Sequence, residues 1–261
     1  MEQNQSMAIF GDYAIFICHY KGLMGELFNI KKKEYISSIS LPYVPFKMPH
    51  ANTSCFGKSF LNENSILPLL YVSSFDEDSD RGCFVYDISQ DGGVIKASLT
   101  QRIIPVISSK EIGSGALDWV VDYDSNYIYS IAYNKGGQER RFSWENEIII
   151  TKFKLPDIKI RGEVYFTEKD IIQSSRFDNM PINQDKCYKD GLLFIVSGGA
   201  DINNVCMNRL RIISLNPLKL IDDLDIALFG IKEPEGLDFY GNQLLINYND
   251  GNPEKIWMIN I

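Results

Sequence analysis

Five short segments of the chain begin with polar side chains that could bind a ligand or take part in acid–base chemistry. Each polar group stands directly before, or at the start of, a run of apolar residues. Carboxylate and amide oxygens can ligate a divalent cation or hydrogen-bond a polar ligand, and an imidazole can act as a general base near neutral pH. The candidate ligand-binding residues are Gln5, His50, Asn52, Asp118, Gln184 and Glu235, with Asp185 as a further carboxylate.

Established catalytic motifs are missing from the sequence. Gly113-Ser114-Gly115 lacks the strand–turn–helix context of a hydrolase nucleophile. The glycine pairs at 92–93 and 198–199 lack the Lys-Ser/Thr of a phosphate-binding loop. With His19 and His50 as its two histidines, the chain cannot form a zinc site of three histidines. The sequence therefore leaves open whether the protein is an enzyme.

Composition limits the classes of partner. The chain has 261 residues, 26 Lys+Arg and 34 Asp+Glu, which gives a net charge of −8. This acidic balance argues against a nucleic-acid partner, because such surfaces need clustered Lys and Arg. No apolar stretch approaches the ~20 residues of a membrane span. The N-terminal residues lack the pattern of a signal peptide. The protein is thus expected to stay inside the cell, or to be an exported protein without its leader.

The elements that must position the polar residues are predicted to be strands. Short runs rich in Ile, Val, Tyr and Phe recur along the chain, separated by turns that contain Gly, Asn and Asp. The clearest runs are 14–20, 69–73, 127–133, 192–196 and 244–248, and the clearest turns are 11–12, 124–126, 189–191 and 241–242. Helical periodicity is almost absent. The best helical candidates are 169–174 and 222–227, and the second fits a strand equally well.

Alignment of these turns reveals a unit of four strands that repeats along the chain. The units span approximately 5–42, 49–106, 116–167, 182–229 and 233–261, and the first four end on strands at 34–41, 94–104, 159–166 and 218–228. Four antiparallel strands repeated at this spacing are typical of propeller blades. We therefore expect an all-β, single-domain, five-bladed β-propeller. The fifth unit ends on its third strand, so either the last blade has three strands or upstream residues complete it.

Two parts of the sequence resemble known propellers. The segment Glu233-Pro234-Glu235-Gly236-Leu237-Asp238 resembles an inner strand of the calcium-dependent, gluconolactonase-like propellers. Residues 49–52, 67–73 and 117–119 are similar to a group of bacterial propeller proteins without an assigned activity, many of them exported. The first resemblance implies a divalent cation such as Ca²⁺, held by Glu235, with Asn52 and Asp118 matching by position.

Two functions follow from the expected fold. The polar starts of the inner strands would line one mouth of the central channel, so the first hypothesis is a binding or interaction module for a small polar ligand, a glycan or a peptide. The alternative is a metal-assisted hydrolase of the lactonase type, with His50 or Asp185 as general base. The same polar residues could also simply face water, which would leave the protein without a site at this mouth.

Overall fold

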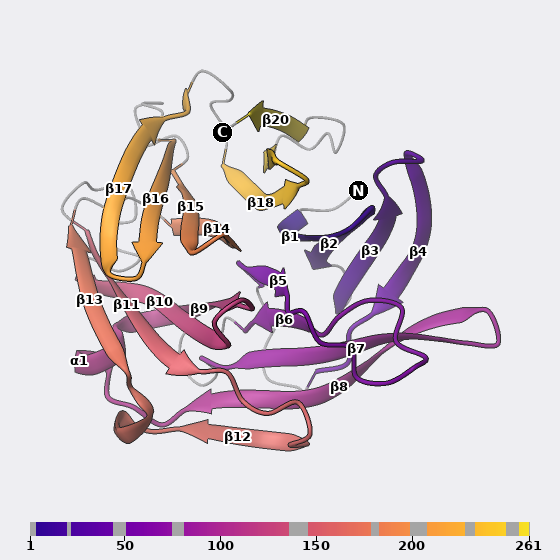
Figure 1. The fold of residues 1–261 in the computed structure, drawn as a ribbon, viewed down its shortest axis with the longest axis horizontal. Helices are drawn as coiled ribbons and strands as arrows, with labels where there is room; N and C mark the ends of the chain where they lie inside the picture. The colour runs from indigo at the N-terminus through magenta and orange to yellow at the C-terminus, as the bar shows by residue number, and fades with distance from the viewer. Residues whose placement is uncertain are drawn as a thin grey trace.

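The computed structural model describes residues 4–19, 22–43, 51–74, 81–135, 146–178, 183–198, 208–227, 233–248 and 256–260. Among these residues the strands form five sheets arranged around one axis (Figure 1). Blade one contains β1 (Asn4–Phe10), β2 (Tyr13–His19), β3 (Leu23–Asn29) and β4 (Glu34–Ser40). Blade two contains β5 (Ser54–Phe56), β6 (Leu70–Ser73), β7 (Cys83–Asp91) and β8 (Val94–Pro105).

The remaining three blades follow the same order. Blade three contains β9 (Ser114–Asp122), β10 (Tyr127–Lys135), β11 (Glu147–Lys154) and β13 (Gln173–Asp178). Blade four contains β14 (Asn183–Lys189), β15 (Leu192–Ser197), β16 (Arg209–Leu215) and β17 (Leu218–Asp225). Blade five has three strands, β18 (Pro234–Tyr240), β19 (Gln243–Tyr248) and β20 (Ile256–Asn260). The predicted five-bladed propeller is confirmed, and of the two alternatives for the last blade the described residues show the three-stranded one.

In four of the five blades a tight turn joins the inner strand to the second strand, whereas residues 57–69 connect β5 to β6 in blade two. Gly11 (φ 58°), Asn126 (φ 61°), Asp190 (φ 51°) and Gly241 (φ 61°) lie in these four turns. Glycine adopts positive φ without steric cost, and Asn and Asp tolerate it better than other residues do. The turn chemistry that revealed the repeat in the sequence is therefore present in the structure.

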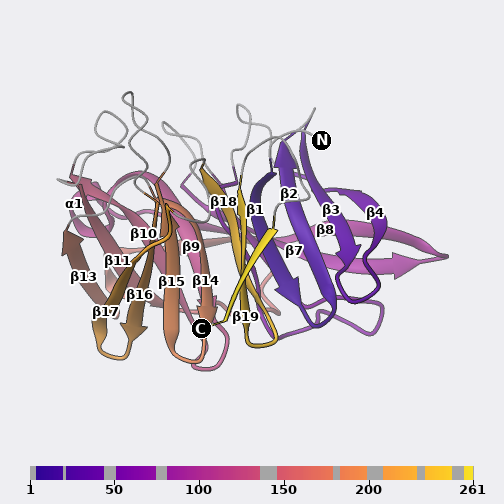
Figure 2. The ribbon, with the colours of Figure 1, turned by 90° about the horizontal axis from the view of Figure 1, so that it is seen from above.

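The hydrophobic core lies between the blades. Each of the five core clusters of the described residues combines side chains from two neighbouring blades. The cluster between blades five and one contains Met7, Ile9, Phe16 and Leu245. Because no strand of the described residues is shared between these two blades, side-chain contacts close the ring there, with β1 beside β18 (Figure 2). No helix in the described part of the chain is both long enough and apolar enough to span a membrane.

One predicted strand pairs with a different blade. The sequence placed the fourth strand of blade three at 159–166, but that position is held by β13. The strand β12 (Gly162–Phe166) instead pairs in parallel with β8, as a fifth strand of blade two. The first helical candidate, 169–174, is instead a single 3-10 turn at Glu168–Asp170 followed by β13. The second candidate, 222–227, lies mostly in the strand β17. A short helix, α1 (Ser109–Ile112), joins blades two and three.

Phe166 explains why β12 lies where it does. Its ring stacks on Phe153 with a centroid distance of 4.7 Å and an interplanar angle of 8°, and its centroid is 6.0 Å from that of Trp119. These rings belong to the apolar cluster between blades two and three. Blade three thus supplies a strand that covers blade two, anchored by an aromatic side chain at the seam between them.

We predict that Phe166→Ala lowers the free energy of unfolding by about 3–5 kcal/mol, because it removes a buried aromatic anchor and leaves a cavity. The neighbouring Tyr165 is 55% exposed and provides a matched control on the same strand. Tyr165→Ala should cost less than about 1 kcal/mol. Urea unfolding of both variants tests this account, and equal losses would contradict it.

Candidate functional site

The centre of the ring is occupied by a buried carboxylate, Asp185 of β14. Its Oδ2 accepts hydrogen bonds from the backbone N–H of Met7 in β1 (3.1 Å) and of Leu237 in β18 (2.8 Å). Its Oδ1 accepts the N–H of Lys186 (2.7 Å). Burial raises the pKa of the Asp185 carboxyl well above its usual range, while the three backbone donors and the Lys186 ammonium act in the opposite direction. Asp185 therefore joins blade four to blades one and five.

The next residue, Lys186, joins blade four to the other two blades. Its Nζ lies 2.6 Å from Asp118 Oδ2 in β9 and 3.4 Å from Thr53 Oγ1, directly before β5. The ammonium also donates to the carbonyl oxygen of Gln184, and the side chain has no solvent exposure. Successive side chains of a strand point to opposite sides, so this dipeptide reaches both halves of the ring. We call Asp185, Lys186 and Asp118 the central plug.

The same kind of contact recurs around the axis. An inner strand pairs with its own blade along one edge only, so alternate backbone N–H groups on the other edge need acceptors. In β9 these acceptors are Ser73 Oγ, for Trp119 N (2.8 Å), and Cys55 Sγ, for Val121 N (3.4 Å). In β1, the Met7 N–H donates to Asp185. Side chains of neighbouring blades therefore satisfy backbone donors that face the axis.

The structure gathers most of the predicted site residues on the inner strands, but as buried groups. Gln5, Asp118, Gln184 and Glu235 are all buried, and Asn52 is half-buried. The Oε1 of Gln5 and the Oδ1 of Asn52 have no hydrogen-bond partner among the described residues. His50 lies outside the described residues. Of the predicted residues, Asp118 and Gln184 are brought together by contacts with Lys186, a residue not predicted from the sequence. A ligand-binding role for the predicted residues stays a prediction.

The plug does not suit the divalent cation implied by the gluconolactonase resemblance. A metal cation bound at Asp118 would be repelled by the Lys186 ammonium, whose Nζ lies 2.6 Å from the Asp118 carboxylate. In the described part of the chain, no group of three or more His, Cys, Asp and Glu side chains is placed to hold a metal ion. Asp185 has no exposure and its oxygens accept backbone donors, so it is poorly placed to act as a base on a substrate. A metal role for Glu235 and Asn52 stays a prediction.

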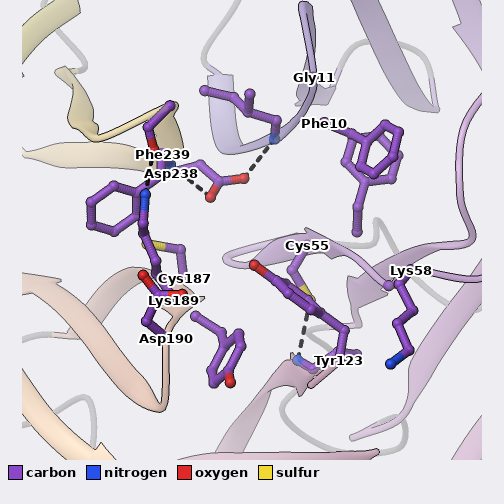
Figure 3. A pocket seen from close by; sticks show the side chains of 16 residues that line it. Phe10, Gly11, Cys55, Lys58, Tyr123, Cys187, Lys189, Asp190, Asp238 and Phe239 are labelled. Atoms are coloured by element: carbon purple, nitrogen blue, oxygen red, sulfur yellow. Dashed lines mark hydrogen bonds between the residues drawn. The ribbon is translucent and has the colours of Figure 1, made fainter. Parts of the chain in front are cut away.

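A cavity of about 370 Å³ lies at the opposite mouth, where the inner strands end (Figure 3). We call it the strand-end pocket. All five inner strands, or the turns directly after them, contribute to its lining. Aromatic rings, two thiols and four charged side chains face it: Phe10, Phe56, Tyr123, Tyr188, Phe239, Cys55, Cys187, Lys58, Lys189, Asp190 and Asp238. None of these residues was among the site residues predicted from the sequence, which lie at the strand starts.

Asp238 is a carboxyl of the pocket that two backbone N–H groups bind. Its Oδ2 accepts the N–H of Ile9 (2.5 Å), and its Oδ1 accepts the N–H of Phe239 (2.8 Å). Burial raises the pKa of Asp238 to about 7, while the two backbone donors and the charge of Lys189 act to lower it. Because the N–H groups of Met7 and Ile9 are bound by Asp185 and Asp238, two carboxylates fasten the free edge of β1.

The other reactive side chains of the pocket are held in their neutral forms. Burial raises the pKa of the Cys55 thiol to about 12 and that of Cys187 well above its usual range. Burial also raises the pKa of Tyr123 to about 12. A thiol attacks as the thiolate, so neither cysteine is prepared for nucleophilic chemistry near neutral pH. A signal for this pocket was present in the sequence, since Cys55-Phe56 and Cys187-Tyr188 occupy equivalent places in two units.

We predict that Lys186→Met lowers the free energy of unfolding by about 3–5 kcal/mol, because Asp118 then remains buried without its ammonium partner. Adding Asp118→Asn to this variant should restore part of the loss, since the uncompensated charge is removed. Urea unfolding of the single and double variants measures both effects. A double variant less stable than Lys186→Met would contradict the assigned role of the pair.

No family model and no curated protein matches the sequence. Solved structures are similar in fold. One is a chain in the structure of ctPRC2 in complex with H3K27me3 and H3K27M, with 10% identity and a TM-score of 0.49 over 99% of this chain and 55% of that one. This chain therefore spans about half the length of that relative. Another is the β-propeller domain of Cps50 (Swd1) from Myceliophteria thermophila, with 12% identity, a TM-score of 0.49, and coverage of 99% and 84%.

Proposed function

We propose that the protein is a binding module that holds a small ligand in the strand-end pocket. The observation that carries this proposal is a cavity of about 370 Å³ to which every blade contributes through its inner strand. Small-molecule sites are concave, largely apolar and equipped with a few polar groups, and they fall in this range of volume. Rings such as Phe10, Phe56 and Tyr123 provide apolar walls, and charged groups provide orientation.

The strand-end pocket is a better ligand site than the strand-start mouth predicted from sequence. At the strand starts, the plug fills the centre with groups that bind one another. At the strand ends, the charged side chains surround open space. The volume suits a small molecule, one sugar ring or one inserted peptide side chain, so the expected classes of partner remain a small polar ligand, a glycan and a peptide.

Binding is favoured over the hydrolase alternative by the state of the pocket side chains. The two thiols are neutral near pH 7, and Asp238 is fastened to two backbone donors. No histidine lines the pocket in the part of the chain described. The general bases proposed for the lactonase-type reaction, His50 and Asp185, are not among the described residues that line this pocket, and that reaction stays a prediction at the strand-start mouth.

We predict that Phe10→Ala weakens small-molecule binding at least about tenfold, because it removes one apolar wall of the pocket. Tyr13 pairs with Phe10 across the β1–β2 hairpin and is equally exposed, 38% against 37%, but does not line the pocket. Tyr13→Ala should therefore leave binding unchanged.

The test uses 2-naphthoate, 2-naphthamide, 2-naphthylmethylammonium, methyl glucoside and a Gly-Phe-Gly peptide as probes. Binding is measured by NMR shifts of the protein amides and by calorimetry. Shifts centred on Phe10, Tyr123 and Lys189, with loss of affinity in Phe10→Ala alone, support the proposal. Shifts confined to the strand starts, or no binding by any probe, would refute it.

A further inference from the structure

The charges of the strand-end pocket differ from those of the chain as a whole. Two lysines, Lys58 and Lys189, and two carboxyls, Asp190 and Asp238, line it. With Asp238 ionised these four charges cancel, and with Asp238 protonated the sum is +1, whereas the whole chain carries −8. Lys58 is exposed, and no carboxylate of the described residues forms an ion pair with it. The pocket lining is therefore neutral with Asp238 ionised and carries +1 with Asp238 protonated, on a protein that is acidic as a whole.

Lys189 is fixed beside Asp238. Its ammonium donates to the carbonyl oxygen of Gly241, lies 3.2 Å from Asn242 Oδ1, and stands 4.6 Å from the centroid of the Phe239 ring. An aromatic face next to a carboxylate could attract a cationic ligand. Here that face is already occupied by a cation of the protein, which would repel a second one. The arrangement favours an anionic ligand instead.

Asp238 has capacity left for such a ligand. Each of its oxygens accepts one backbone N–H, from Ile9 or Phe239, and each retains a second lone pair. When one oxygen is protonated, it can donate a hydrogen bond to an anion. The other titratable groups that line the pocket with Asp238 are Cys187, Tyr188 and Lys189 of β14, Asp190 after β14, Cys55 and Lys58 from the β5 segment, and Tyr123 after β9.

We infer that the strand-end pocket takes a small organic carboxylate with a flat apolar body, and that Asp238 takes up one proton from solvent as this anion binds. The inference rests on the proposed binding function and specifies its ligand class. Lys58 and Lys189 attract the carboxylate, the protonated Asp238 donates a hydrogen bond to one of its oxygens, and the rings of Phe10, Phe56 and Tyr123 contact the apolar body.

Proton uptake gives the binding a defined pH dependence. The pKa of Asp238 is raised to about 7 by burial. Below this pH, Asp238 is already protonated and the affinity for an anion is at its maximum. Above it, binding must draw a proton from solvent, so the affinity falls by about tenfold for each pH unit. A neutral ligand of the same shape has no such dependence.

The experiment compares 2-naphthoate with its neutral counterpart 2-naphthamide on the full chain between pH 5.5 and 8.5. The naphthoate carboxylate is ionised throughout this range, so changes in affinity report on the protein. We expect the affinity for 2-naphthoate to be constant up to about pH 7 and to fall approximately tenfold for each pH unit above it. Calorimetry at pH 8, in buffers of different ionisation enthalpy, should show the uptake of one proton per bound ligand. 2-Naphthamide should bind more weakly at pH 6 and without a pH dependence.

Variants assign the effect to residues. Asp238→Asn should bind 2-naphthoate at pH 8 at least as tightly as the wild type and without a pH slope, because an amide N–H donates as the protonated acid does. Lys58→Ala should weaken naphthoate binding at every pH with an unchanged slope. Lys219→Ala, at an exposed lysine of β17 outside the pocket, is the matched control and should change neither.

The outcomes separate the two proposals. If neither probe binds, the binding function fails and this inference falls with it. If 2-naphthamide binds as tightly as 2-naphthoate at pH 6, or if naphthoate affinity is the same at pH 6 and pH 8.5, the binding function stands and the inference is overturned. The pH slope and proton count of the wild type decide this even if Asp238→Asn does not fold.

Discussion

The structure depends on the polar groups that face the axis of the ring. Each inner strand has one edge that its own blade does not pair, and five such edges meet at the centre. Asp185 and Lys186, neighbours on β14, contact the other four blades between them through Met7, Leu237, Asp118 and Thr53. A buried ion pair is costly to desolvate, and its advantage over apolar packing lies in directional contacts. Here those contacts satisfy backbone donors and fix five blades around one point.

The plug also determines where a ligand can lie. It fills the strand-start half of the axis with groups already bound to one another, and the strand-end pocket begins on the other side. Asp238 has two roles there: its hydrogen bond to Ile9 fastens the seam between blades five and one, and its carboxyl faces the pocket. A ligand that changes the protonation of Asp238 therefore acts on a contact that closes the ring.

Much of the fold was predictable from local sequence. Turn residues such as Gly11, Asn126 and Gly241 mark the hairpins, so the repeat and the three-stranded last blade could be recognised. The convergence of Asp118 and Asp185 followed from their places in the repeat. Their role did not, because Lys186 lies in the middle of a strand, and a sequence does not tell which opposite charge a buried lysine reaches. The pairing of β12 with β8 also could not be predicted from the sequence, because residues 162–166 have the pattern of an edge strand, which fits blade two and blade three equally well. The pocket was not predicted, because its lining residues, such as Cys55, Tyr123 and Phe239, are mostly apolar or aromatic and resemble core positions of a strand.

Amide hydrogen exchange measures the central claim most directly. If Asp185 holds the ring together, the amides of Met7 and Leu237, which it binds, should exchange only through global unfolding, with protection equal to the free energy of unfolding. This is expected even though Met7 and Leu237 lie in different blades and donate to a side chain rather than to a neighbouring strand. Exchange of either amide far faster than global unfolding allows, at the rate of the outer strands β4 and β17, would contradict the account.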